Sequence, residues 1–220
     1  MEDLELMNLW KSYDQKLEQN LSYNRSNATE ITKMKVSALL SSMKPLKIFT
    51  ILVGLVWVGY GSIILINLFL FAFSSVSKFF LFSAGLQVLL TGIALVIYLY
   101  QLVLIHQVDL DQPVLQTQRQ FASLKSSTLL ATRILFLQLP LWTTFYWSEQ
   151  MFINTNIILL LVQGLITLSF TVAAIWLFVN IRYENRNKKW FRFLFEGKEW
   201  TPVIKSMEML SQIEEYKGEN

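Results

Sequence analysis

Four long apolar runs constrain this sequence more than any other feature. They occupy residues 48–73, 79–105, 128–147 and 156–180, and only the third contains a charged residue. A helix needs roughly 20 apolar residues to cross the hydrocarbon core of a bilayer. We therefore predict an all-α membrane protein with four transmembrane helices, paired as two antiparallel hairpins and surrounded by membrane lipid.

The third run is the least regular of the four. It has Arg133 near its start and Pro140 inside, where the missing backbone N–H predicts a kink. We expect the Arg133 side chain to extend back to the lipid headgroups. Before this run, Asp111 and Pro113 predict the start of a helix that continues into the third span.

Lysine and arginine residues give the orientation of the predicted spans. Seven precede the first run and eight follow the fourth, Arg119 and Lys125 lie between the second and third, and Lys78 is alone on the other side. Because basic residues concentrate in cytoplasmic loops, both termini and the middle loop, residues 106–127, are predicted to be cytoplasmic.

The same boundaries divide the chain into three parts. Residues 1–47 form an N-terminal helical arm, residues 48–181 form the membrane domain, and residues 182–220 form a C-terminal segment. The arm, the middle loop and the C-terminal segment all contain amphipathic patterns. We expect these cytoplasmic pieces to be able to pack together as a small cap below the membrane.

The N-terminal arm contains an amphipathic helix with aromatic residues on its apolar face. This face, the arm stripe, comprises Leu6, Trp10, Tyr13, Leu17 and Leu21. The stretch SYNRSN at 22–27 interrupts the pattern, and Asn27 with Glu30 resembles a capping box, so a second helix is predicted to start there and to end at Pro45. We expect the arm stripe to be buried, first against the same protein or the lipid surface and otherwise against a separate partner.

The C-terminal segment opens with basic residues alternating with aromatic ones. The candidate lipid-headgroup contacts are Arg186, Lys188, Lys189, Trp190 and Arg192. Beside a span, this composition favours the anionic inner leaflet over nucleic acid, so we expect no direct nucleic-acid partner. Thr201 and Pro202 then predict the start of a last amphipathic helix.

Polar side chains inside the runs are few. Gln87 and Gln163 lie well inside their spans and are predicted to hydrogen-bond between helices rather than to contact a substrate. None of the polar residues is acidic, which weighs against proton-coupled pumps and cation carriers, because these usually need a carboxylate in the membrane.

Small residues in the first two runs predict a close-packed antiparallel hairpin. They are Gly54, Gly59 and Gly61 in the first run and Gly85 and Gly92 in the second. Glycine lets two helix backbones approach closely.

The sequence contains no signature of an enzyme. Cysteine is absent, His106 is the one histidine, and none of the common nucleophile, phosphate-loop or zinc motifs occurs. Asp109 and Asp111 form a DxD pair, but helix capping and solvation explain it better than a metal does. We predict no enzymatic activity, no cofactor and no metal.

Three functions remain. The first is a membrane-bound regulator or scaffold whose cytoplasmic helices bind a soluble protein. The second is a structural subunit that assembles with copies of itself or packs only on itself. The third is a small transporter or channel, which the lack of carboxylates in the membrane disfavours.

The chain also resembles a known group of proteins. The residues that carry the resemblance are LW at 9–10, DLDQPV at 109–114 and the following QRQFASLK. This arrangement looks like uncharacterised four-span inner-membrane proteins of Bacteroidota, which are often encoded beside sigma factors of the extracytoplasmic-function type. The resemblance implies a bacterial inner membrane location and an anti-sigma role in transcription regulation, with a sigma factor bound by the N-terminal arm.

Overall fold

The computed structural model describes residues 2–108, 110, 114–153, 157–195 and 201–218, with side chains for all of these except 2–6, 8, 114, 115 and 210–218. Every regular element in this part of the chain is helical. The elements are α1 (Glu2–Phe71), α2 (Lys78–Gln107), α3 (Val114–Phe136), α4 (Leu139–Thr144), α5 (Gln150–Ile153), α6 (Ile157–Asn180), the 3-10 turn η1 (Tyr183–Asn185), α7 (Lys189–Phe195) and α8 (Thr201–Gly218).

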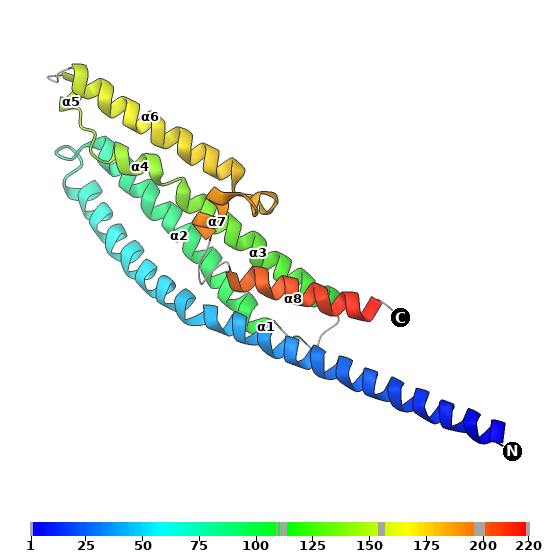
Figure 1. The fold of residues 1–220 in the computed structure, drawn as a ribbon. Helices are drawn as coiled ribbons and strands as arrows, with labels where there is room; N and C mark the ends of the chain where they lie inside the picture. Colours follow the sequence, from blue (N-terminus) through cyan, green and yellow to red (C-terminus); the bar gives the residue numbers. More distant parts are fainter. Residues whose placement is uncertain (1, 109, 111–113, 154–156, 196–200, 219–220) are drawn as a thin grey trace.

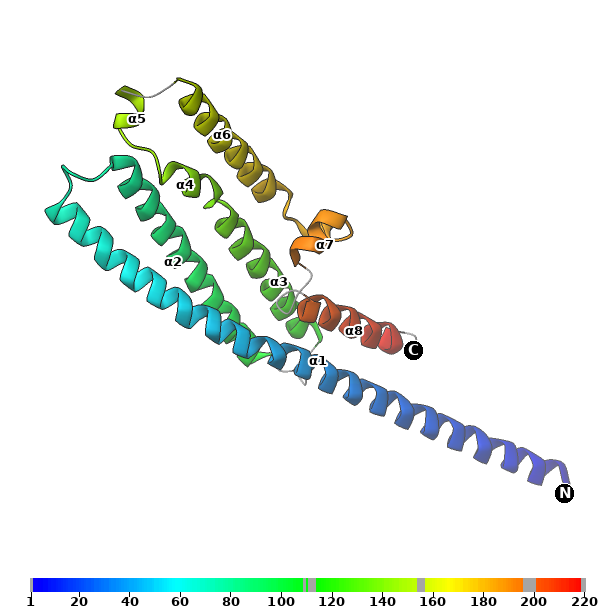
Figure 2. The ribbon, with the colours of Figure 1, turned by 60° about the vertical axis from the view of Figure 1, so that its left-hand side comes forward.

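The long helices lie side by side as a bundle, and one of them extends far beyond it. The second half of α1 lies along α2, and the α3–α4 pair lies between α2 and α6 (Figures 1 and 2). The first half of α1 leaves the bundle and projects past α8 (Figures 1 and 2). Helices α1, α2 and α6 are each long and apolar enough to cross a membrane.

The N-terminal arm is continuous with the first apolar run, so the prediction of two arm helices was wrong. Residues 22–27 lie inside α1, and Asn27 is not a helix start. Serine and asparagine cost only about 0.5 kcal/mol each in a helix, and residues 2–44 contain neither glycine nor proline. The hydroxyl of Thr29 also donates to the carbonyl of Arg25 at 2.9 Å, which keeps a polar side chain inside the helical pattern.

Proline 45 does not end the helix either. It lies inside α1, on the exposed side, between the buried residues Met43 and Lys47. The pyrrolidine ring of Pro45 removes one backbone N–H donor from α1. However, Met43 and Lys47 on either side of it are held in place by packing against the bundle. The junction predicted at this residue is therefore a point within one helix.

The third apolar run is divided between two helices. α3 begins at Val114 and continues into the run, and it ends at Phe136. α4 begins at Leu139, with Pro140 in its first turn. The proline cannot donate to a preceding carbonyl, which places the break at 137–138. The proposed starting residues, Asp111 and Pro113, lie outside the described residues.

The two connections at one end of the bundle contact each other. The hydroxyl of Ser77 donates to the carbonyl of Trp147 at 2.7 Å. The Lys78 ammonium lies 3.0 Å from a carboxylate oxygen of Glu149, and the Phe79 and Phe152 rings stack at 5.7 Å between centroids. These contacts hold the α1–α2 and α4–α6 connections together.

At the opposite end, four helices form an apolar core. Its fully packed members are Val36, Leu40, Met43, Leu104, Ile105, Phe121, Leu124 and Val203, which come from α1, α2, α3 and α8. The predicted cap therefore exists in part: the last third of the arm, the end of α2, the start of α3 and α8 meet in it. The arm stripe takes no part in it.

A buried lysine joins α1 to α2 just above this core. The ammonium of Lys47 donates to Oε1 of Gln101 at 2.6 Å and lies 4.1 Å from the centroid of the Tyr98 ring. Lys47 and Gln101 are fully buried. A buried ammonium is costly unless hydrogen bonds and other charges compensate it, so this contact fixes the relative position of the two helices.

The close approach between α1 and α2 occurs at Gly54. A Cβ added there would collide with the side chain of Leu95, which is itself buried. At Gly61 the nearest atom would be Cγ2 of Val88 at 3.0 Å, whereas a Cβ at Gly85 or Gly92 would meet no described atom within 4 Å. Gly54 and Gly61 of the first run, rather than Gly85 and Gly92 of the second, make room for the neighbouring helix.

We predict that Gly54→Ala lowers the stability of the bundle, because Leu95 must move inside a packed interface at a cost of about 1–3 kcal/mol. The matched control is Gly59→Ala in the same helix, where a Cβ meets nothing within 4 Å. Thermal unfolding in detergent measures both variants. Equal melting temperatures for the two variants would contradict the packing described for α1 and α2.

We predict a strong coupling between Lys47 and Gln101. Gln101→Leu leaves the ammonium without its amide acceptor, and Lys47→Met leaves the amide oxygen without its donor; each costs about 1–3 kcal/mol. The double variant is expected to be more stable than the sum of the two losses predicts, because both buried polar groups are removed together. Unfolding in detergent checks the cycle, with the exposed Lys35→Met as control; additive losses would refute the coupling.

Candidate functional site

The described side chains of the arm stripe are exposed in the structure, so they do not pack on the same chain, and their burial against lipid or a separate partner stays a prediction. Trp10 and Tyr13 are each 65% exposed, and Leu17 is 59% exposed. Leu21 is exposed too, whereas the side chain of Leu6 lies outside the described ones. Trp10, Tyr13 and Leu17 line an open groove whose other members include Asp14 and Lys16.

The arm stripe and the buried face of α1 point in different directions. Successive residues of an α-helix are rotated by about 100°, so Val36, Leu40 and Met43 share one side of α1. The same rotation places Trp10, Tyr13 and Leu17 on average about 110° around the helix from that side. The arm stripe therefore cannot reach the apolar core by the packing that α1 already uses.

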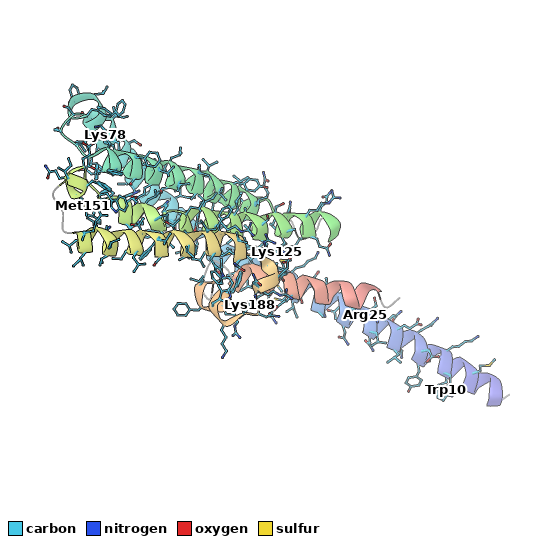
Figure 3. All side chains as sticks on the ribbon, turned by 90° about the horizontal axis from the view of Figure 1, so that it is seen from above. Trp10, Arg25, Lys78, Lys125, Met151 and Lys188 are labelled. Carbon is cyan, nitrogen blue, oxygen red and sulfur yellow. The ribbon has the colours of Figure 1, made fainter. Side chains whose placement is uncertain are left out.

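The arm stripe also lies far from the bundle. Thirty-three residues separate Trp10 from Met43, which at 1.5 Å per residue is about 50 Å along the helix axis. Trp10 and Arg25 lie on the projecting part of α1, whereas Lys125 and Lys188 lie near the base of the bundle (Figure 3). Lys78 and Met151 mark the opposite end (Figure 3).

The predicted lipid-contact residues separate into two groups. Lys188 and Lys189 are exposed, and neither lines the cleft described next. Trp190 is half-buried, with its ring 4.9 Å from that of Trp176 on α6. Arg186 and Arg192 line an open cleft between the α7 region and α8.

This cleft, the basic cleft, has a third cation that the sequence did not reveal. Lys205 of α8 lines it together with Arg186 and Arg192, and Phe191, Phe195 and Ile204 give it apolar walls. Phe191 and Phe195 stack at 4.3 Å between ring centroids. Nothing in the spacing of the sequence indicates that Lys205 joins the group, because packing of α8 brings it there.

Lys125, which comes from α3, adds another cation beside the basic cleft. The ammonium of Lys125 on α3 is 3.9 Å from the centroid of the Tyr183 ring, and the Arg186 guanidinium is 4.5 Å from the same centroid. Burial lowers the pKa of Lys125 from its ordinary value, and the positive charge of Arg186 lowers it further. Positive charge is thus concentrated around one ring.

Polar side chains connect α4 to both of its neighbours. Nε2 of Gln163 on α6 donates to the carbonyl of Thr143 at 3.0 Å. Nε2 of Gln138 donates to Oγ1 of Thr91 on α2 at 3.0 Å. Gln87 is buried, and its Nε2 has no hydrogen-bond acceptor among the described atoms. Gln138, which the sequence analysis had not selected, thus joins the start of α4 to α2, and the hydroxyls of Ser83 and Thr144, 2.8 Å apart, join the same two helices.

Arg133 makes a contact that the sequence did not predict, while its predicted contact with lipid headgroups stays a prediction. Its Nε donates to the carbonyl of Ile181 at 2.6 Å, just after α6 ends. The last carbonyls of a helix lack partners within the helix, so this hydrogen bond caps α6 and joins it to α3. The neighbouring carbonyl of Asn180 accepts from Nδ2 of Asn185 at 2.6 Å.

The described residues hold no group of three histidine or acidic side chains able to bind a metal ion. The absence of an enzymatic activity and of a cofactor stays a prediction. Comparison with known proteins finds no family model that matches this chain, no similar curated protein and no similar solved structure.

Proposed function

We propose that this chain is an integral membrane scaffold that holds a soluble cytoplasmic protein at the membrane by means of the arm stripe. The observation that carries the proposal is the exposed Trp10, Tyr13 and Leu17 face of α1, turned away from the buried face of the same helix. An exposed apolar face on a long projecting helix is typical of a docking surface for another helix.

The proposal includes four spans with both termini in the cytoplasm. The α3–α4 pair is the fourth crossing element, broken at 137–138. Its end and the start of α2 are adjacent, since Ser83 and Thr144 hydroxyls are 2.8 Å apart, and Gln163 near the start of α6 bonds to Thr143. Neighbouring elements therefore alternate in direction, as two antiparallel hairpins require.

We predict a specific labelling pattern for this topology. The chain has no cysteine, so single cysteines can be introduced without background. Ser75→Cys and Gln150→Cys are expected to react with a membrane-impermeant maleimide in intact cells, and Ser12→Cys and Asn187→Cys only after permeabilisation. Labelling of Ser75→Cys and Gln150→Cys from opposite sides would refute four spans.

Packing of the arm stripe on the same chain or on the lipid surface is less well supported. The core packs against a different side of α1 than the arm stripe, and the arm extends beyond the bundle from the membrane-crossing half of that helix (Figures 1 and 2). A helix that leaves the membrane along the bundle axis moves away from the lipid surface. Burial of the arm stripe against a separate protein chain is therefore better supported.

An anti-sigma factor of a bacterial inner membrane is one specific form of this proposal. Its support is the resemblance carried by residues 9–10 and 109–114. The structure adds only that residues 9–10 lie on an exposed helix, while 111–113 fall outside the described residues. Sequestration of a sigma factor by the arm stripe, and its release by a membrane signal, remain parts of the proposal.

Self-assembly of the arms is the second candidate. Positions 6, 10, 13, 17, 20, 24, 27, 31 and 34 follow alternating steps of three and four residues, which is the spacing of a coiled-coil seam. Two copies in one membrane would also present parallel arms. However, positions 20, 24 and 27 are all asparagine, which weakens the middle of such a seam.

We predict that a photo-crosslinking amino acid at Tyr13 or Leu17 of the full-length protein in cells gives a discrete adduct with a soluble protein. The control positions are Gln15 and Ser22, which lie on the other side of the arm and are exposed. Trp10→Ala/Leu17→Ala is expected to weaken binding more than tenfold, because anchors of this type each contribute about 2 kcal/mol or more.

The same double variant is expected to leave the melting temperature in detergent nearly unchanged, because exposed substitutions usually alter stability by about 0.5 kcal/mol or less. A lower melting temperature would support packing within the chain instead. An adduct of twice the chain mass would support self-assembly, and equal adducts from both sides of the arm would refute the proposed docking surface.

A further inference from the structure

The basic cleft combines three cations with an apolar wall. It has a volume of about 460 Å³ and lies between the segment after α6 and the first turns of α8. Its cations are Arg186, Arg192 and Lys205, and Glu208 is the acidic residue among its described lining. The charges of this described lining sum to +2, which favours an anion.

The surrounding residues increase this preference. Lys125 and Arg186 both lie against the ring of Tyr183, at 3.9 and 4.5 Å from its centroid. Two like charges beside one ring repel each other, and the pKa of Lys125 is lowered first by burial and further by this repulsion. An anion beside them relieves that repulsion, which adds to its attraction to the cleft.

The walls of the basic cleft suit an anion that carries apolar groups. The stacked rings of Phe191 and Phe195 and the side chain of Ile204 line it beside the cations. Guanidinium groups bind phosphate oxygens with paired hydrogen bonds, whereas the rings offer nothing to a hydrated inorganic ion. A phosphate joined to a glycerol and to the start of acyl chains satisfies both parts.

The depth of the cleft in the membrane agrees with this ligand. α6 is long and apolar enough to span a bilayer and ends at Asn180, six residues before Arg186. Trp176 and Trp190 pair at 4.9 Å at this end, and tryptophan favours the boundary between hydrocarbon and water. In the topology proposed above, the cleft therefore lies at the level of the lipid headgroups.

We propose that the basic cleft is a binding site for the headgroup of an anionic phospholipid of the inner leaflet, with the phosphate held by Arg186, Arg192 and Lys205 and the glycerol region against Phe191 and Phe195. The choice of leaflet rests on the cytoplasmic C-terminus proposed above. The site itself depends only on the cleft, so binding in detergent tests it independently of the topology and of the arm stripe.

The test uses the full-length protein purified in detergent and titrated with phosphatidylglycerol or phosphatidylcholine. Bound lipid is counted by native mass spectrometry, and thermal unfolding is followed in parallel. We expect phosphatidylglycerol to bind at least tenfold more tightly than phosphatidylcholine and to raise the melting temperature. Equal binding of the two lipids would overturn the proposal.

The key variant is Arg186→Gln/Arg192→Gln/Lys205→Gln, which is expected to lose at least tenfold in affinity for phosphatidylglycerol. The control, Arg119→Gln/Lys188→Gln/Lys189→Gln, removes the same charge from exposed positions that do not line the cleft. It is expected to keep most of the affinity. Equal losses in the two variants would show general electrostatic attraction and would overturn a defined site.

Two further measurements test the proposal even if the triple variant unfolds. Lys205→Gln alone changes one exposed side chain and is expected to weaken binding severalfold. Millimolar inorganic phosphate, and separately a short RNA, are added as competitors against phosphatidylglycerol. Full displacement by either would assign the cleft to that other ligand and overturn the lipid proposal; little displacement supports it.

Discussion

The buried contact between Lys47 and Gln101 fixes the position of α1 relative to α2, and the packing of α1 on both sides of this contact depends on it. It joins α1 to α2 at 2.6 Å between Nζ and Oε1, in a fully buried setting where a mismatch of either group is costly. On one side of it, α1 packs along α2 through the close approach at Gly54. On the other side, α1 enters the four-helix core through Met43 and Leu40 and then leaves the bundle.

Because α1 is one helix, the bundle determines the direction of the arm. A separate arm helix joined by a flexible link would sample many directions and could fold back over its own core. A continuous helix carries Trp10 about 50 Å from the core without a joint. The arm stripe is therefore presented to the cytoplasmic space under the proposed topology, and its distance from the bundle leaves room for a folded partner.

The sequence predicted the features that depend on local composition and missed those that depend on packing. The apolar runs predicted the helical class and four spans, and three helices of the structure are long and apolar enough to cross a membrane; Thr201 also predicted the start of the last helix. The break in the arm at 22–27 was wrong, because weak helix formers inside a long helix cost less than ending it. A local sequence pattern does not reveal which of these two free-energy costs is smaller.

In the candidate sites, too, the sequence predicted what depends on local pattern and missed what depends on packing. Arg186 and Arg192 were found from the basic-aromatic pattern, since they are close in sequence. Lys205 comes from another helix, so only the packing of α8 places it in the basic cleft. Lys47 is one of the seven basic residues that precede the first run and that the sequence predicts to be cytoplasmic, whereas the structure buries its side chain entirely. No pattern of neighbouring residues distinguishes a lysine at the lipid boundary from one inside a helix interface.

α8 connects the two surfaces on which the proposals depend. Val203 is buried in the core that supports the base of the arm, whereas the adjacent Ile204 and Lys205 line the basic cleft. A ligand that holds Lys205 therefore also restrains the helix against which α1 packs. Binding at the membrane surface and support of the arm use the same short helix, so the stability of this end of the bundle depends on both of its faces at once.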